Sequence, residues 1–209
     1  MSRAKLMLIL LMGITLPLTA CFDLKQPRNK IEYYSLEYDP PRMSEHPPVS
    51  QVIKVALFSV SPIYNTRKII YRDAAYKRAA YDYHKWQANP AEFVPYFLAR
   101  DMQQSGLFKA VVSRKSRFPH AYALEGTVNE FLESDVSDGW QADLSLNVFL
   151  VNEQENDVTK KIIFQKSYHV SKPCRQKNPQ ALAEAMSAAM SEASALIIQE
   201  VYNHLADRQ

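Results

Sequence analysis

The sequence predicts a single α+β domain in which a mixed or antiparallel β-sheet carries two main helices on one face. Candidate strands come in runs instead of alternating strictly with helices, which is typical of α+β domains. Only two long segments, residues 89–105 and 180–205, show helical spacing of apolar residues. No internal repeat, low-complexity segment or charge block marks a second domain, so residues 31–209 are expected to form one domain.

The first residues have the pattern of a secretory leader. Arg3 and Lys5 precede an apolar run from Leu6 to Leu18, and the small residues Thr19 and Ala20 come directly before Cys21. A cysteine after small residues is the lipobox of bacterial lipoproteins, and several acyl chains on one residue give firm membrane attachment. The sequence therefore predicts a signal peptide over residues 1–20 and lipidation of Cys21. The run is shorter than the roughly 20 residues of a transmembrane helix.

Composition excludes several classes of protein. Two of the 25 Lys and Arg residues lie in the leader, so the mature chain is nearly neutral against its 22 Asp and Glu residues, which argues against a nucleic-acid partner. Once Cys21 is lipidated only Cys174 remains, and no intramolecular disulfide is possible. Three mature glycines argue against a phosphate-binding loop.

The N-terminal third is expected to contain a tether and two strands. Residues 21–30 are polar and predict a flexible tether. Residues 31–38 are rich in tyrosine and end before Pro40, which predicts a strand. Residues 51–60 are apolar on both faces, as in a central strand.

A hairpin and a helix follow. Residues 68–72 and 76–83 are two short tyrosine-rich runs, as in a hairpin. Asn89 is a good N-cap, and the helix should then run from Pro90 to Ser105. Pro95 falls beyond the first turn, so we expect either an irregular first turn or a later start.

The remaining chain alternates between strands and one long helix. Strands are expected at residues 108–112, 121–132, 142–150 and 161–170, the last two forming an antiparallel pair. The final helix, 180–205, carries an apolar stripe that must pack on the sheet. This stripe consists of Leu182, Met186, Ala189, Ala193, Leu196, Ile197 and Val201.

The sequence does not indicate catalytic chemistry. The five histidines lack the short spacings of metal ligands, so neither a metal nor a cofactor is expected. A nucleophilic pair of Cys174 and His169 has no third orienting residue. The carboxylates Glu130 and Glu133 are expected to be solvated surface groups. We therefore predict a protein that is not an enzyme.

The segment from Tyr71 to Trp86 is dense in aromatic and basic residues. Such residues suit either a sheet core or a protein interface, in which a few tyrosine, tryptophan and arginine side chains contribute most of the binding energy. Arg72, Arg78, Tyr81 and Trp86 are the candidate partner-binding residues. The loss of either arginine is expected to leave stability unchanged.

The order and spacing of several motifs resemble the ABC-type transport auxiliary lipoproteins, including the paraquat-inducible protein C group. The motifs are Tyr33-Tyr34-Ser35-Leu36 after the lipobox, Ile70-Tyr71-Arg72, Tyr81-Asp82-Tyr83-His84-Lys85-Trp86 with Pro90 following, and Ser105-Gly106-Leu107-Phe108-Lys109-Ala110-Val111. The resemblance covers residues 31–205.

This resemblance implies a non-enzymatic lipoprotein that works with a mammalian-cell-entry (MCE) protein and, through it, an ABC permease and ATPase to move lipids between membranes. Asp23 lies one place after the position of the usual inner-membrane retention signal, which favours the periplasmic face of the outer membrane. Two other classes remain open. One is a lipoprotein that plugs or assembles an outer-membrane barrel, and the other is a periplasmic hydrolase.

Overall fold

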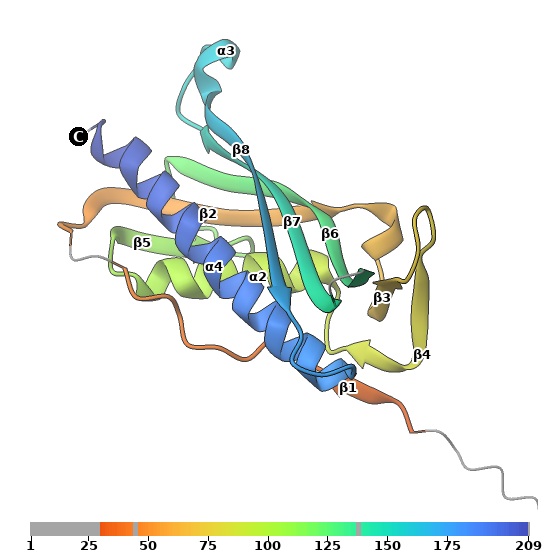
Figure 1. Cartoon of the computed structure of the whole chain (residues 1–209). Coiled ribbons are helices and arrows are strands. Elements are labelled where there is room, and N and C mark those ends of the chain that lie inside the picture. Colours follow the sequence, from red (N-terminus) through yellow and green to blue (C-terminus); the bar gives the residue numbers. More distant parts are fainter. Residues whose placement is uncertain (1–29, 44–45, 137–138, 209) are drawn as a thin grey trace, which may run out of the picture. The chain divides into compact units, whose positions relative to one another are not determined.

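The computed structural model describes residues 30–43, 46–136 and 139–208. Within these residues the chain forms an eight-stranded mixed sheet and two long helices (Figure 1), which confirms the α+β prediction. The leader, Cys21 and most of the tether lie outside the described residues. The strands are β1 (Glu32–Tyr34), β2 (Val49–Val60), β3 (Lys68–Arg72), β4 (Ala79–Trp86), β5 (Phe108–Ser113), β6 (Tyr122–Val136), β7 (Gly139–Asn152) and β8 (Ile162–Pro173). The helices are η1 (Pro62–Tyr64), α2 (Pro90–Gln104), α3 (Val158–Lys161) and α4 (Pro179–Ala206).

Strand β6 is the centre of the sheet. One of its edges pairs with β7 along the whole strand, and β7 pairs with β8 in the expected antiparallel register. Its other edge pairs first with β2, in parallel, and then with β3. The register of β6 against β7 shifts between Val128 and Glu130, where the partner on the other edge changes from β2 to β3. A bulge of this kind bends a strand, so one strand can serve both halves of the sheet.

Gly126 is required where β2 and β6 meet. A Cβ atom at this position would lie 2.6 Å from the carbonyl oxygen of Asn147 and 2.7 Å from the ring of Phe58. Both distances are below van der Waals contact. Any larger residue would therefore displace β7 or expel the buried Phe58 ring from the core.

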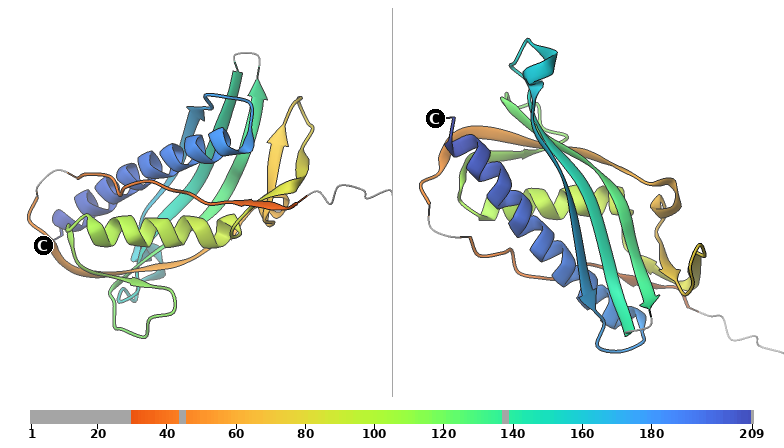
Figure 2. Two further views of the ribbon diagram at one scale, coloured as in Figure 1. Left: turned by 90° about the horizontal axis from the view of Figure 1, so that it is seen from below. Right: turned by 45° about the horizontal axis from the view of Figure 1, so that its top comes forward.

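Both long helices pack on the same side of the sheet, as expected. Helix α2 contacts β2 and β5, α4 contacts β7 and β8, and the two helices contact each other (Figure 2). The core lies between this helical layer and the sheet, and it includes the expected α2 residues Phe93, Phe97, Leu98 and Met102.

Helix α2 begins where its cap predicts. The Asn89 side chain accepts a hydrogen bond from the Ala91 N–H at 3.0 Å, and Pro90 occupies the first turn. The helix continues through Pro95 to Gln104, so neither an irregular start nor a later one is observed. Pro95 is buried, and its missing N–H leaves one helical hydrogen bond unmade.

Helix α4 is buried on the predicted face with one exception. Leu182, Met186 and Ile197 are inaccessible to solvent, whereas Leu196 is 48% exposed. The prediction that Leu196 belongs to the buried stripe is therefore wrong. Spacing after Ala193 fits either residue 196 or residue 197, and the sheet contacts only the side of the helix that carries Ile197.

Candidate functional site

The tyrosine hairpin, which we define as β3, β4 and their connection (Lys68–Trp86), joins the sheet by few backbone pairs. Tyr71 pairs with Glu133 and Arg72 with Ser134 on β6, and β1 pairs in parallel with β4 on the other side. The hairpin was expected from the sequence, but its second strand begins at Ala79 instead of Tyr76. With so few backbone pairs, side-chain contacts must contribute to its position.

One such contact joins Tyr81 to Glu133. The Tyr81 hydroxyl lies 3.1 Å from both carboxylate oxygens of Glu133, and its ring centroid lies 5.0 Å from that of Tyr71. Glu133 is only 1% exposed, so the expectation of a solvated carboxylate is wrong. Burial raises the pKa of Glu133 to about 6, although the Tyr81 hydrogen bond opposes this shift. Burial and the neighbouring Glu133 charge raise the pKa of Tyr81 as well, so its hydroxyl stays protonated and can donate.

A second contact joins Arg72 to Asp143 on β7. The Arg72 Nη2 lies 2.7 Å from Ser134 Oγ and 3.2 Å from Asp143 Oδ2. The buried Asp143 carboxylate also accepts hydrogen bonds from Ser134, from Ser171 Oγ at 2.6 Å and from Gln141 Nε2 at 3.0 Å. The Arg72 guanidinium thus forms an ion pair with the buried Asp143 carboxylate. This contact argues against the expectation that loss of Arg72 leaves stability unchanged, because its removal would leave the buried Asp143 carboxylate without its cation.

Trp86 lies in the core. It is 1% exposed, and its ring makes edge contacts with Phe131 at 5.2 Å and Phe93 at 6.4 Å between centroids. Of the two alternatives for this residue, the structure selects core packing. Trp86 positions the hairpin and presents no surface to a partner.

The hairpin also carries aromatic and basic side chains that solvent reaches. Tyr76 is fully exposed at the turn and has a φ of 60°, an unfavourable backbone conformation for a bulky residue. Tyr83 is 46% exposed, and Arg78 is partly exposed with its Nη1 donating to the Lys77 carbonyl at 3.0 Å. We call Tyr76, Arg78 and Tyr83 the hairpin surface.

Pairing of β1 with β4 adds a further aromatic residue beside the hairpin. Tyr33 is 50% exposed, and the Arg67 guanidinium lies 4.8 Å from its ring centroid. Sequence reasoning missed this neighbour, because β1 and β4 are separated by about fifty residues and no local pattern indicates their pairing.

Cys174 and His169, which the sequence places five residues apart, do not have the features of a nucleophilic dyad. His169 lies 3.3 Å from Ser171 Oγ and 3.9 Å from Glu130. Burial and the carboxylates Glu133 and Asp143 raise the pKa of the Cys174 thiol to about 11. A thiol with a raised pKa remains protonated at neutral pH and reacts poorly. Across the described ranges, no three His, Cys, Asp or Glu residues form a group that could hold a metal ion.

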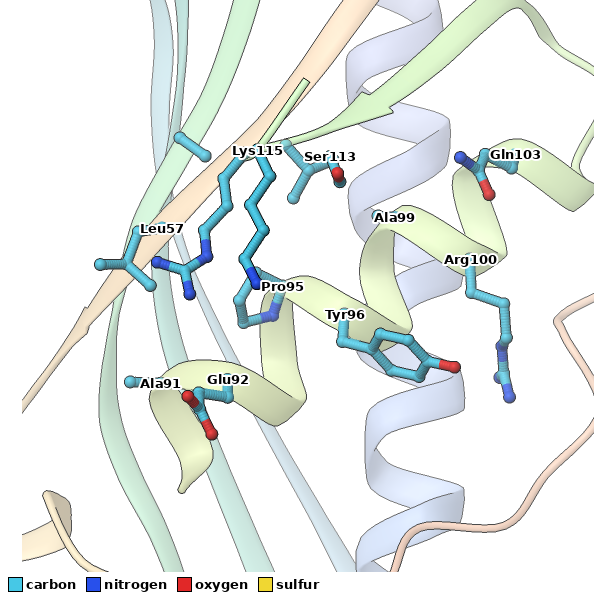
Figure 3. A pocket seen from close by; sticks show the side chains of 13 residues that line it. Leu57, Ala91, Glu92, Pro95, Tyr96, Ala99, Arg100, Gln103, Ser113 and Lys115 are labelled. Carbon is cyan, nitrogen blue, oxygen red and sulfur yellow. The ribbon is translucent and has the colours of Figure 1, made fainter. Parts of the chain in front are cut away.

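A pocket of about 390 Å³ opens between β2, α2 and the end of β5. Figure 3 shows Leu57, Pro95 and Tyr96 around this α2 pocket, with the Lys115 side chain extending over Pro95 and Arg100 pointing away. Sequence reasoning did not find this pocket. Two sequence signals belong to it, namely the unexplained proline inside α2 and the apolar outer face of β2 at Leu57.

Helix α4 is the one helix in the described part of the chain that is long and apolar enough to cross a membrane. However, 67% of its apolar window is buried inside the domain. Most of its apolar residues are therefore core residues, with Leu196 as an exposed exception.

A family model and solved structures relate the chain to known proteins. The model of the ABC-type transport auxiliary lipoprotein component family matches residues 34–197. The fold is similar to the crystal structure of protein XCC0632 from Xanthomonas campestris, with a TM-score of 0.75, 18% identity and coverage of 85% of this chain and 98% of that one. It is also similar to the hypothetical protein CT253 from Chlamydia trachomatis, with a TM-score of 0.54, 10% identity and coverage of 75% and 98% respectively. No curated protein matches.

The two structural similarities establish the fold alone, since identity is low. The family match is more specific, because it spans most of the described domain, including the tyrosine hairpin, α2 and the greater part of α4. It also agrees with the resemblance carried by the motifs between Tyr33 and Val111. The chain belongs to the family of ABC-type transport auxiliary lipoprotein components.

Proposed function

We propose that this protein docks a periplasmic MCE protein near the outer membrane, with the hairpin surface as the contact. As a member of its family, it is an auxiliary lipoprotein component of an ABC-type transport system. The observation that carries the proposal is the exposure of Tyr76, Arg78 and Tyr83 on a hairpin that is fixed from beneath by buried polar contacts. Tyrosine and arginine are the residue types that most often dominate interface energies.

The contacts of the hairpin with β6 and β7 should hold this surface in place before a partner binds. Tyr81 forms a hydrogen bond with Glu133, and Arg72 forms an ion pair with Asp143. The Trp86 ring packs against neighbouring aromatic rings. A surface that is already ordered loses little conformational entropy on association. Tyr81, Arg72 and Trp86 therefore support the surface, while the adjacent exposed side chains would contact the partner.

Membrane attachment is proposed to occur through acyl chains on Cys21. The lipobox that ends at Cys21 supports this assignment, and the position of Asp23 supports the outer membrane as the destination. The tether over residues 21–30 would then hold the domain on the periplasmic side. No enzymatic step is needed for this role.

The docking proposal is tested by co-purification of the MCE protein with the tagged full-length lipoprotein. Tyr83→Ala and Arg78→Ala should each weaken binding of the MCE protein by about thirtyfold, the effect of losing an interface residue worth about 2 kcal/mol. Tyr96→Ala and Arg117→Ala are matched controls, because both side chains are exposed and lie outside the hairpin. Melting temperatures should stay near that of the parent in all four variants.

Retention of the MCE protein by both hairpin variants at the parental level would contradict the docking surface. Recovery of an outer-membrane barrel protein in place of the MCE protein would favour the alternative of a barrel plug or assembly factor.

A further inference from the structure

We propose that the α2 pocket binds the acyl chain of a lipid whose head group is anionic. The site lies on a different part of the domain from the hairpin surface, and it rests on the chemistry of its own walls. It does not require the docking role, so either proposal can fail while the other stands.

The apolar floor arises from the ends of two paired strands. Pairing of β5 with β2 stops at Ser113 opposite Val55, whereas pairing of β6 with β2 continues to Val60. Among the described residues, strand β2 therefore has no strand neighbour on its β5 side beyond Val55. Leu57 lies two residues further along β2 and is 51% exposed, although it belongs to a strand in the interior of the sheet. A leucine left uncovered at this point gives an alkyl chain an apolar surface to contact.

Helix α2 supplies the opposite wall. Ala91, Pro95 and Ala99 recur at intervals of four and so share one face, and Tyr96 beside them is 65% exposed. The small alanines keep this wall shallow. Because Pro95 lacks an N–H, the helix gives up a backbone hydrogen bond at the pocket wall and presents a ring of carbon atoms there.

Charge at the rim is unbalanced. Arg114 and Lys115 follow β5, are exposed, and form no ion pair with any carboxylate in the part of the chain that the structure describes. Arg100 is different, because its guanidinium lies 2.7 Å from the buried Asp101 and is already neutralised. Glu92 is the single carboxylate among the lining residues. The two free cations thus leave the rim positive and suited to a phosphate or carboxylate group.

Size favours an acyl chain over a protein segment. The volume of about 390 Å³ lies in the range of roughly 300–1,000 Å³ that is usual for small-molecule sites. A stable protein interface needs about 800 Å² on each partner, far more than this hollow offers. An apolar trough with cations at one side fits one alkyl chain and its head group.

The test uses the full-length lipoprotein in a bacterial host, with the photoreactive residue benzoyl-phenylalanine in place of Tyr96. Cells are grown with alkyne-tagged palmitate, irradiated, and the purified protein is digested. Mass spectrometry of the peptide containing residue 96 then detects acyl adducts separately from the acyl chains attached near the N-terminus. Tyr83 replaced in the same way is the matched control, since it is also an exposed tyrosine.

Acyl adducts at residue 96 should exceed those at residue 83 by at least tenfold. Leu57→Glu should lower the yield at residue 96 about fivefold or more by placing a charge in the trough. Arg114→Glu combined with Lys115→Glu should lower it severalfold, and this variant lies on an exposed loop where folding is not at risk. Unchanged melting temperatures show that both variants are folded.

Equal labelling at residues 96 and 83 would overturn the proposal, because it would show only proximity to the membrane. Absence of acyl adducts, or a polypeptide adduct at residue 96, would overturn it as well. Co-purification of the MCE protein, measured on the same samples, is expected to be unaffected by the pocket variants and reports separately on docking.

Discussion

Glu133 is a buried carboxylate that contacts no cation in the part of the chain that the structure describes, and this gives the protein a defined dependence on pH. Its pKa in the folded state is about 6, against about 4.5 in the unfolded chain. Between these values the folded protein keeps a proton that the unfolded chain has released. The contribution of Glu133 to the free energy of unfolding therefore falls as the pH rises through this window. Well above pH 6, the ionised Glu133 lowers the free energy of unfolding by about 2 kcal/mol.

Glu133→Gln should remove this penalty while the amide oxygen still accepts the Tyr81 hydrogen bond. We expect the variant to be more stable than the parent by up to about 2 kcal/mol at pH 7.5, and to show little difference at pH 4. Urea unfolding at the two pH values measures this. Glu125→Gln on the same strand is the control. If Glu133→Gln is instead less stable than the parent at pH 7.5, and this difference shrinks at pH 4, the ionised carboxylate stabilises the fold.

Arg72 is expected to contribute strongly to stability. Breaking a buried ion pair costs about 3–5 kcal/mol, and we expect about 2–4 for Arg72→Ala because water reaches the guanidinium, whose side chain is 30% exposed. Asp143→Asn in the same background removes the unpaired charge and should recover part of the loss. Urea unfolding of both variants tests this, with Arg78→Ala as the control, because Arg78 is a partly exposed arginine whose Nη1 donates to a backbone carbonyl. Parental stability of Arg72→Ala would mean that Asp143 is satisfied by its hydroxyl and amide donors alone.

Among the elements, α4 provides the sharpest comparison, because two adjacent residues differ fully in environment. Ile197 is 0% exposed and Leu196 is 48% exposed. Ile197→Asp should unfold the domain, since an unpaired buried charge costs several kcal/mol against a total stability of about 5–15. Leu196→Asp should leave the melting temperature within a few degrees of the parent. Unfolding caused equally by both substitutions would show that Leu196 is covered in solution.

The elements with strong local signals were predictable. Asn89 and Pro90 fixed the start of α2, and the alternation along β7 fixed which of its residues are buried. Features that depend on contacts between residues far apart in the sequence were not predictable. Nothing near Glu133 indicates that Tyr81 covers it, and nothing near Leu57 indicates that β5 ends beside it. Periodicity also could not choose between Leu196 and Ile197, because positions three and four residues after Ala193 both lie close to it on the helix surface, one on each side.

At the scale of the whole molecule, the core and the proposed anchor occupy separate parts of the sequence. Every buried apolar residue of the described core lies between Leu36 and Leu205, whereas the lipobox ends at Cys21. The hairpin surface and the α2 pocket both lie on the domain, so packing within the domain sets their geometry.

Cys21→Ala should therefore abolish membrane attachment and leave the domain folded. Acyl chains on this residue are the proposed anchor, and an alanine cannot accept them. Fractionation of cells should move the protein from washed outer membranes to the soluble fraction, with a melting temperature close to that of the parent. Cys174→Ala is the matched control, because it removes the other cysteine, which is half-buried in the domain, and should leave the protein on the membrane. If the Cys21→Ala protein still sediments with outer membranes as the parent does, some surface of the domain and not a lipid holds it there.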